Sequence, residues 1–124
     1  GILAIAAVKL GAKEVTAVDN DPQAIVATIS NVEANHAQKQ ISVLHTDDEG
    51  KLDKADLLIA NILANPLVSL CEHFAHLVKP GGRIALSGIM DDQLAMILET
   101  YSEYFQELKV VQKDEWCCVS GQRK

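Results

Sequence analysis

An uncharged amide at the end of an apolar run is the feature of this sequence best suited to chemistry. Asn61 follows residues 55–60, which are apolar except for Asp56. Such a run is typical of a strand buried on both faces of a parallel sheet, and open α/β sheets bind ligands at the carboxyl ends of their strands. There Asn61 can accept a hydrogen bond from an amine, and this contact can orient the lone pair of the amine nitrogen toward an electrophilic methyl group. The alternative is a buried Asn61 that only satisfies backbone groups.

A carboxylate ends another short apolar segment, residues 14–19. Asp19 at a strand end can accept two hydrogen bonds from a ribose diol, which suits an adenosine cofactor such as NAD or S-adenosylmethionine. The alternative is that Asp19 caps the turn at Asn20. Asp21 and Pro22 follow, and they are typical of a helix N-cap and first helical position. Asp19 is therefore the candidate ligand and Asp21 the structural residue.

Two further acids, Asp47 and Asp48, follow the apolar segment 41–45. If that segment is a neighbouring parallel strand, both acids lie at the same edge of the sheet as Asp19. A carboxylate there can accept a hydrogen bond from the exocyclic amine of adenine. A solvated acidic loop over residues 46–54 explains the same residues equally well.

Other kinds of site find no support in the residue spacing. The four histidines show no metal-ligand spacing, and His73 and His76 are expected on the exposed face of a helix. Ser87 and Gly88 end another strand, and we interpret them as tight packing near a pocket, not as a nucleophile. No Ser/His/Asp or Cys/His combination stands out.

Composition narrows the class of protein. A chain of 124 residues forms one domain at most. The net charge of −6 argues against a general nucleic-acid surface, which needs to neutralise phosphates. The three cysteines are an odd number, with Cys117 and Cys118 adjacent, so we expect reduced thiols in the cytosol. No apolar run approaches the roughly 20 residues of a membrane span, and no signal-peptide pattern opens the chain.

The elements that position these residues alternate between helix and strand. Strands are expected at residues 14–19, 41–45, 55–61 and 83–87, followed by an antiparallel hairpin within 105–122 that is broken at 113–115. The intervening helices are expected to have inward faces made of Leu3, Ala6, Ala7 and Leu10; of Ile25, Ile29 and Val32; of Leu67, Leu70, Cys71, Phe74, Leu77 and Val78; and of Leu94, Ile97, Leu98 and Tyr101.

Three further helix boundaries follow from local signals. Gly11 should end the first helix, Asn65-Pro66 should begin the third, and Asp91 or Asp92 should cap the last. Strands joined by helices predict an α/β fold, a Rossmann-like, doubly wound and mostly parallel sheet with a C-terminal antiparallel hairpin.

Several segments resemble known methyltransferases. Residues 1–7 resemble the end of the cofactor loop and the first helix of class I S-adenosylmethionine-dependent methyltransferases, and residues 18–24 and 77–82 resemble two later motifs. Residues 61–67, Asn-Ile-Leu-Ala-Asn-Pro-Leu, are similar to the ribosomal protein L11 methyltransferase family, together with residues 86–89 and 115–119.

The resemblance implies transfer of methyl groups from S-adenosylmethionine to amino groups of ribosomal protein L11 in the bacterial cytoplasm, with no direct nucleic-acid or membrane partner. It implies that Asp19 holds the cofactor ribose and that Asp47 or Asp48 approaches the adenine. Asn61 would face both the methyl group and the target amine, and Gly1 would be the last glycine of the cofactor loop. The oligomeric state stays open.

The sequence departs from the family pattern at its start. It opens on Gly1, without the strand and Asp-x-Gly-x-Gly loop expected before it, and without the family's separate N-terminal domain. We therefore expect residues 1–124 to be an N-terminally truncated catalytic domain that lacks the first strand and is inactive alone. Two alternatives stay open: a methyltransferase for a release-factor glutamine or a nucleobase, and a nicotinamide-binding Rossmann domain. The first usually has a Pro-Pro-aromatic segment where this chain has residues 62–64, and segment 61–66 and the hairpin argue against the second.

Overall fold

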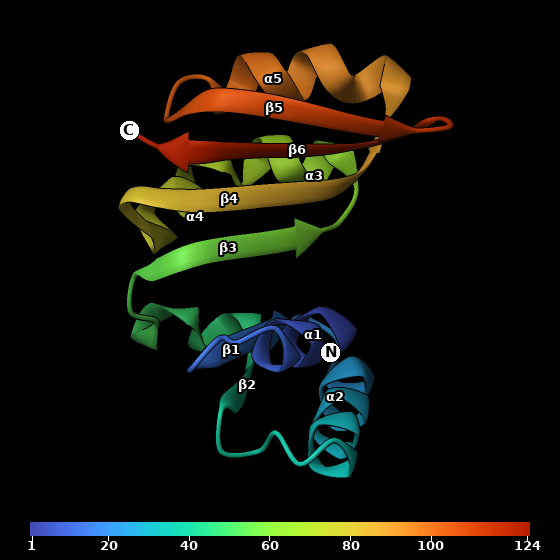
Figure 1. Ribbon diagram of the computed structural model, residues 1–124, viewed down its shortest axis with the longest axis vertical. Coiled ribbons are helices and arrows are strands. Elements are labelled where there is room, and N and C mark those ends of the chain that lie inside the picture. The colour runs from blue at the N-terminus through green and yellow to red at the C-terminus, as the bar shows by residue number, and fades with distance from the viewer. The chain divides into compact units, whose positions relative to one another are not determined.

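The computed structural model describes the backbone of residues 1–124 and every side chain except those of Glu49 and Lys51. Helices and strands alternate along the chain, which confirms the α/β class (Figure 1). The chain divides into two compact units, Gly1–Leu52 and Asp53–Lys124, and each is described by itself. The strands form two sheets, one of two strands and one of four, where the sequence predicted a single sheet.

The first unit is built around a two-stranded parallel sheet. Strands β1 and β2 pair from Val15 opposite Ile41 to Asp19 opposite His45, and a helix makes the crossover that parallel strands require. The elements are α1 (Ile2–Lys9), β1 (Val15–Asp19), α2 (Pro22–Ala34), β2 (Ile41–His45) and the 3₁₀ helix η1 (Thr46–Lys51). Val32, Ala37 and Ile41 form the core of this unit.

The predicted inward face of α1 is wrong. Leu3, Ala6 and Leu10 are exposed, with 88% of Leu10 accessible. The residues of α1 that pack on the core are Ala4, Ile5 and Val8. Because α1 is almost wholly apolar, its periodicity does not distinguish one face from another. Gly11 does end the helix as predicted, with a left-handed φ of +113°.

Helix α2 begins as the sequence predicted. The side chain of Asp21 accepts a hydrogen bond of 2.9 Å from the Gln23 backbone nitrogen, and Pro22 is the first helical residue. Its inward face is only partly as predicted, because Thr28 is buried beside Val32 whereas Ile29 is 43% exposed.

The second unit is a four-stranded sheet in the order β3-β4-β6-β5. β3 and β4 are parallel, and β6 pairs antiparallel with both β4 and β5, which confirms the C-terminal hairpin. Helices α3 and α4 pack against β4, and α3 also contacts α5. The elements are β3 (Ala55–Asn61), α3 (Ala64–Ser69), α4 (Cys71–Leu77), β4 (Val78–Met90), the 3₁₀ helix η2 (Asp91–Gln93), α5 (Leu94–Tyr101), β5 (Phe105–Lys113) and β6 (Trp116–Arg123).

Two aromatic side chains anchor the core of this unit. Tyr101 and Phe105 are fully buried, with ring centroids 5.9 Å apart. The Tyr101 hydroxyl donates a 2.7 Å hydrogen bond to the carbonyl oxygen of Leu67, so its polar end is satisfied inside the core. Beside them the Cys71 thiol donates to the Thr100 carbonyl oxygen at 3.6 Å.

Two predicted helix starts in this unit are wrong. Asn65 does not cap α3: the N-cap is Leu63, and Pro66 is the third helical residue. Proline fits there because the first N–H groups of a helix have no intrahelical acceptor. Neither Asp91 nor Asp92 caps α5, because both lie in η2 and the N-cap of α5 is Gln93, which makes no side-chain capping hydrogen bond there. The Gln93 side chain accepts a hydrogen bond at the start of η2, from the Met90 backbone nitrogen at 3.2 Å.

Other elements differ in extent or burial. The single helix predicted after Pro66 is two helices that meet at Leu70. β4 begins at Val78, before the predicted residue 83. β3 has its predicted bounds but is not buried on both faces, because Leu57 is 51% and Ile59 43% exposed.

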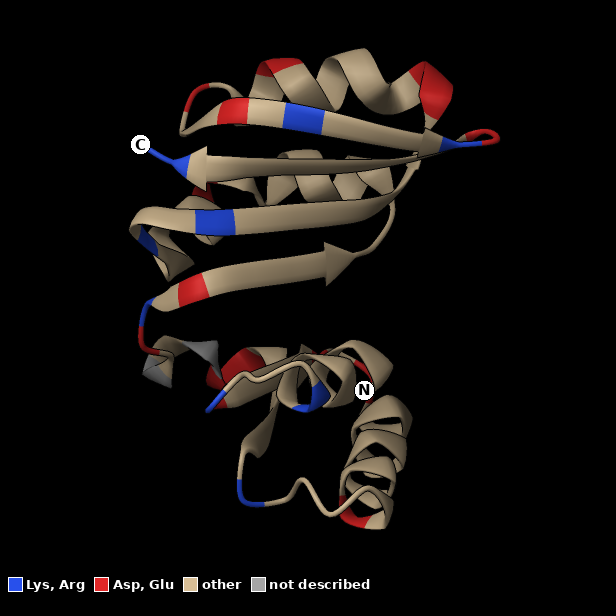
Figure 2. Cartoon of the chain, viewed as in Figure 1, with Lys and Arg blue, Asp and Glu red and all other residues tan. Residues whose placement is uncertain are grey.

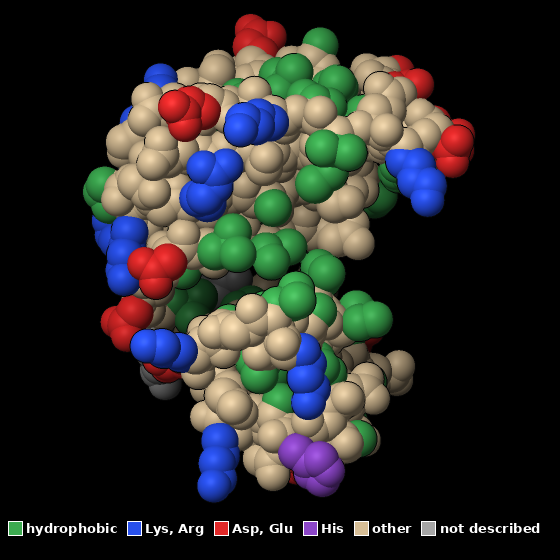
Figure 3. Space-filling model, in the orientation of Figure 1, with side chains coloured by type: hydrophobic (Ala, Val, Ile, Leu, Met, Phe, Trp, Pro, Cys, Tyr) green, Lys and Arg blue, Asp and Glu red, His purple; other side chains and the backbone are tan. Residues whose placement is uncertain are grey.

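The surfaces of the two units are of mixed character. Lys and Arg are interspersed with Asp and Glu along the chain in each unit (Figure 2). Hydrophobic side chains also reach the surface of each (Figure 3). No helix of the described residues is long and apolar enough to cross a membrane.

Candidate functional site

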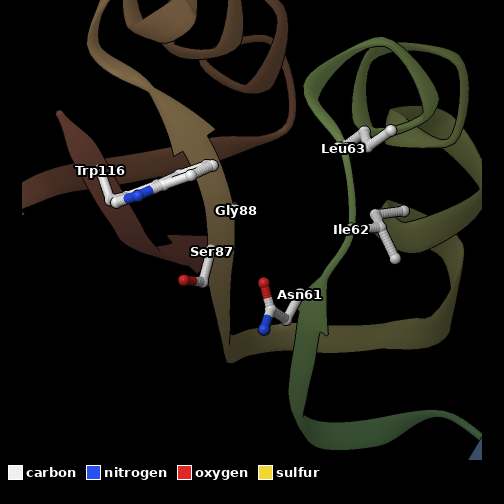
Figure 4. A pocket seen from close by; sticks show the side chains of 6 residues that line it. All are labelled: Asn61, Ile62, Leu63, Ser87, Gly88 and Trp116. Carbon is white, nitrogen blue, oxygen red and sulfur yellow. The ribbon is translucent and has the colours of Figure 1, made fainter.

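Asn61 and Ser87 lie opposite each other where the ladder between two parallel strands ends. Asn61 is the last residue of β3, and its partner in the ladder with β4 is Ser87. The apolar residues before Asn61 form β3, and their pairing with β4 places the amide at the edge where α/β sheets bind ligands. Figure 4 shows the two polar side chains projecting at this edge.

Gly88 makes room for the Asn61 amide. Its φ is +83°, a conformation that favours glycine. A Cβ at this position would lie 2.9 Å from the Asn61 Oδ1 atom and 2.7 Å from the Ile62 carbonyl oxygen. A residue with a side chain would therefore displace the segment that carries the amide. The sequence-based interpretation of Ser87 and Gly88 as tight packing near a pocket agrees with this geometry.

These residues line an open pocket of about 490 Å³. Its walls are formed by Asn61, Ile62, Leu63, Ser87, Gly88 and Trp116. The indole of Trp116 comes from the start of β6, where Trp116 pairs with Met90 of β4, and it is 49% exposed (Figure 4). The pocket thus joins one amide and one hydroxyl to an aromatic and aliphatic wall, as small-molecule and side-chain pockets usually do.

Sequence reasoning gave Trp116 no role in a site. The available signal was a single tryptophan next to the polar hairpin turn, where an amphipathic ring has no core to fill. Its place beside Asn61 depends on the antiparallel pairing of β6 with β4, which the spacing along the chain does not specify.

In the first unit, Asp19 stands at the carboxyl end of β1. Its Oδ1 atom accepts a 3.0 Å hydrogen bond from the backbone nitrogen of Asp21. One of its two carboxylate oxygens therefore caps the turn, as the alternative interpretation of Asp19 expects. The side chain is half-buried, and the residue opposite it in the ladder is His45. A carboxylate held by one oxygen in this way has a defined orientation at the edge of the sheet.

Asp47 and Asp48 lie in η1, directly after β2, and both are exposed. The backbone nitrogen of Asp47 donates to the His45 Nδ1 atom at 3.0 Å. Gly1 immediately precedes α1 and accepts a hydrogen bond from the Ile5 backbone nitrogen at 3.1 Å.

The structure therefore brings the predicted residues together in two groups. Asp19, Asp47 and Asp48 share one end of the β1–β2 sheet, whereas Asn61 belongs to the pocket of the second unit. Among the side chains that the structure describes, no group of three or more His, Cys, Asp or Glu residues is arranged to hold a metal ion. His76 is exposed as predicted, but His73 is half-buried beside Phe74.

Solved structures with the same fold define the class first. The N-methyltransferase NodS from Bradyrhizobium japonicum, in complex with S-adenosyl-L-homocysteine, matches with a TM-score of 0.70 at 16% identity, over 90% of this chain and 67% of that one. The ribosomal protein L11 methylase of Lactobacillus delbrueckii subsp. bulgaricus matches with a TM-score of 0.90 at 35% identity, over 100% of this chain and 65% of that one. The fold is that of the Rossmann-like methyltransferases.

The family follows from the sequence. The family model described as ribosomal protein L11 methyltransferase (PrmA) matches residues 1–124, and this chain belongs to that family. The ribosomal protein L11 methyltransferase of Acinetobacter baylyi is 43% identical over 99% of this chain and 43% of its own length. That of Shewanella woodyi is 44% identical over 100% of this chain and 42% of its own length. The chain thus spans less than half the length of these relatives.

Proposed function

We propose that the protein transfers methyl groups from S-adenosylmethionine to amino groups of ribosomal protein L11 in the bacterial cytoplasm. Membership of the family over all 124 residues supports this function, as does the likeness to a solved L11 methylase. The observation that carries it is the pocket at the end of β3, where an uncharged amide stands beside a tryptophan. The proposal includes neither a nucleic-acid nor a membrane partner.

The first unit fits an adenosine cofactor by the chemistry of its side chains. Asp19 would accept hydrogen bonds from the ribose hydroxyls, because its carboxylate is half-buried and oriented at the carboxyl end of β1. Asp47 or Asp48, just beyond β2, would accept from the adenine amine. Gly1 would contribute its backbone to the cofactor loop.

When bound, S-adenosylmethionine supplies a methyl group that its sulfonium already activates. The residues of the pocket then have to align a neutral amine. Asn61 would accept a hydrogen bond from an amine N–H through Oδ1, which directs the nitrogen lone pair away from the amide. Ile62, Leu63 and Trp116 would lower the polarity around the amine, and this favours its uncharged form.

Substitution of Asn61 tests this role. In the complete natural protein, Asn61→Ala should lower kcat for L11 methylation about 100-fold, because an aligning contact at the reacting atoms is lost. The Kd for S-adenosylhomocysteine, measured by calorimetry, should stay within about twofold, because the amide serves mainly the amine. Asn65→Ala is the matched control, since Asn65 is exposed in the same segment and is not among the residues that line this pocket. Equal losses of turnover and cofactor affinity in Asn61→Ala would refute the assignment.

Substrate class is tested separately. L11, a release factor and a short RNA should be offered to the protein with labelled S-adenosylmethionine, and only L11 should acquire label on amino groups. Titration with NAD should give no saturable binding. Label on the release-factor glutamine or on RNA would replace L11 by one of the alternative substrates.

A further inference from the structure

His45 connects the two loops that carry the candidate cofactor carboxylates. It is the last residue of β2, and 31% of its side chain is exposed. Its Nε2 atom lies 3.1 Å from the carbonyl oxygen of Asn20, the residue after Asp19. Its Nδ1 atom lies 3.0 Å from the backbone nitrogen of Asp47. One imidazole thus contacts both strand-end loops of the first unit.

The chemistry of the two partners fixes the tautomer of this ring. A backbone N–H can only donate, so Nδ1 must accept from Asp47, and a carbonyl oxygen can only accept, so Nε2 must carry the proton that it donates to Asn20. Asp47 Oδ2 also lies 3.3 Å from Nδ1, but an ion pair there would need a proton on the same atom. That carboxylate is 90% exposed, which makes the pair weak, and the neutral ring with both hydrogen bonds is the arrangement that we adopt.

The link begins where the sheet stops. The ladder between β1 and β2 ends at the pair of Asp19 and His45. Beyond this pair, the imidazole contacts Asn20, the first residue after β1, and Asp47, the second residue after β2. It therefore continues the connection between the two strands into the loops. The backbone separation of Asn20 and Asp47 is then set by a rigid ring, not by two independent loops.

We propose that His45 is a positioning residue for cofactor binding, which sets the distance between the Asp19 carboxylate and the Asp47 turn. The inference rests on the proposed function, in which the former holds the ribose and the latter approaches the adenine. His45 itself touches neither group of the cofactor in this role. It acts through the backbone of its two neighbours.

Cofactor affinity in matched variants of the complete natural protein tests the inference. His45→Phe keeps a flat ring but removes both hydrogen bonds, and it should weaken binding of S-adenosylhomocysteine roughly tenfold by calorimetry. His45→Asn keeps an acceptor near the Asp47 nitrogen and should recover part of that loss. His76→Asn, on the exposed surface of α4, should bind like the wild type. KM for S-adenosylmethionine should rise while kcat at saturation stays unchanged.

A measurement without ligand makes the result unambiguous. Long-range ¹H–¹⁵N spectra of the wild type should show a protonated Nε2 and an unprotonated Nδ1 for His45. If the wild type binds S-adenosylhomocysteine and His45→Phe binds it equally well, the inference is wrong and the proposed function stands. If the wild type fails to bind it, the proposed function fails. If circular dichroism shows that His45→Phe does not fold, the His45→Asn variant decides. Wild-type affinity and KM in His45→Asn, together with an Nδ1-protonated ring in the wild type, would then overturn the inference.

Discussion

The side chain of Asn61 fills the space that a side chain on Gly88 would need, so only glycine fits at this position. A Cβ on Gly88 would come within 2.9 Å of Oδ1 of Asn61, the atom to which we assign the contact with the amine. The two residues come from neighbouring parallel strands, β4 and β3. The position of the proposed functional amide therefore depends on the absence of a Cβ atom at Gly88 in the adjacent strand.

Gly88→Ala should lower kcat for methyl transfer about 100-fold, because the new methyl group displaces the Asn61 amide. It should also cost about 1–2 kcal/mol in stability through its left-handed backbone. The measurements are L11 methylation and urea unfolding.

Gly81→Ala is a matched control for this prediction. Gly81 has a φ of +81°, almost that of Gly88, but a Cβ there would meet nothing within 4 Å. It should lose a similar amount of stability from backbone strain and keep its turnover. Equal loss of activity in both variants would mean that strain, and not displacement of Asn61, is responsible.

Trp116→Ala should raise KM for L11 about tenfold and change the affinity for S-adenosylhomocysteine little, because the indole forms a wall of the pocket next to the amide. The KM of Trp116→Phe for L11 should lie between those of the wild type and Trp116→Ala, since phenylalanine restores part of the aromatic surface. Val111→Ala, which removes a 70% exposed hydrophobic side chain from neighbouring β5, is the control and should leave KM unchanged. A KM effect as large in Val111→Ala would point to the hairpin surface and not to the pocket.

Tyr101→Phe should destabilise the protein by about 1–3 kcal/mol, because it removes the hydroxyl that donates to the buried Leu67 carbonyl oxygen. The rest of the ring stays in place, so the packing against Phe105 is kept. Chemical denaturation at neutral pH measures the loss. Tyr104→Phe is the control at a half-buried tyrosine, and an equal loss there would contradict a special role for the Tyr101 hydroxyl.

Alkaline pH should unfold the protein partly through Cys71. Burial raises the pKa of the Cys71 thiol from 9.0 to about 11, with smaller contributions from Glu103 and Glu72. The folded state therefore holds the thiol proton more tightly than the unfolded state does. The corresponding stability is fully present below pH 9.0 and is lost as the pH rises toward about 11.

Urea unfolding at a series of pH values checks this loss. Cys71→Ala should show a shallower decline in unfolding free energy between pH 9.0 and 11 than the wild type does. Cys118→Ala, at a half-buried cysteine, is the control and should keep the wild-type slope. An unchanged slope in Cys71→Ala would show that other groups govern the alkaline limit.

Strand positions could be predicted from the sequence because strands here are apolar runs with polar ends. β2 and β3 have the predicted bounds, and β1 begins only one residue later than expected. The candidate residues follow from the same rule, since Asp19 and Asn61 are simply the polar residues where such runs end. The family resemblance then added what the spacing does not contain, the choice between kinds of adenosine cofactor.

Helix faces and the partners of each side chain could not be predicted as well. In α2, the burial of Thr28 in place of Ile29 depends on how that helix lies on its own sheet. The hydrogen bond of His45 with Asn20, and the pocket that Trp116 and Asn61 both line, join residues at least 25 positions apart. They arise from strand pairing, which no local pattern encodes.

The pairing of Asn61 with Ser87 makes the chemistry sensitive to a residue count. Successive side chains of a strand point to opposite faces, so a slip of one residue in β3 would turn the amide to the other side of the sheet. Leu58 and Ile84, aligned three residues earlier, hold that register by packing in the core. Single-residue insertions or deletions within β3 should therefore be far less tolerated in natural or designed relatives than substitutions at the same positions, even where the fold survives.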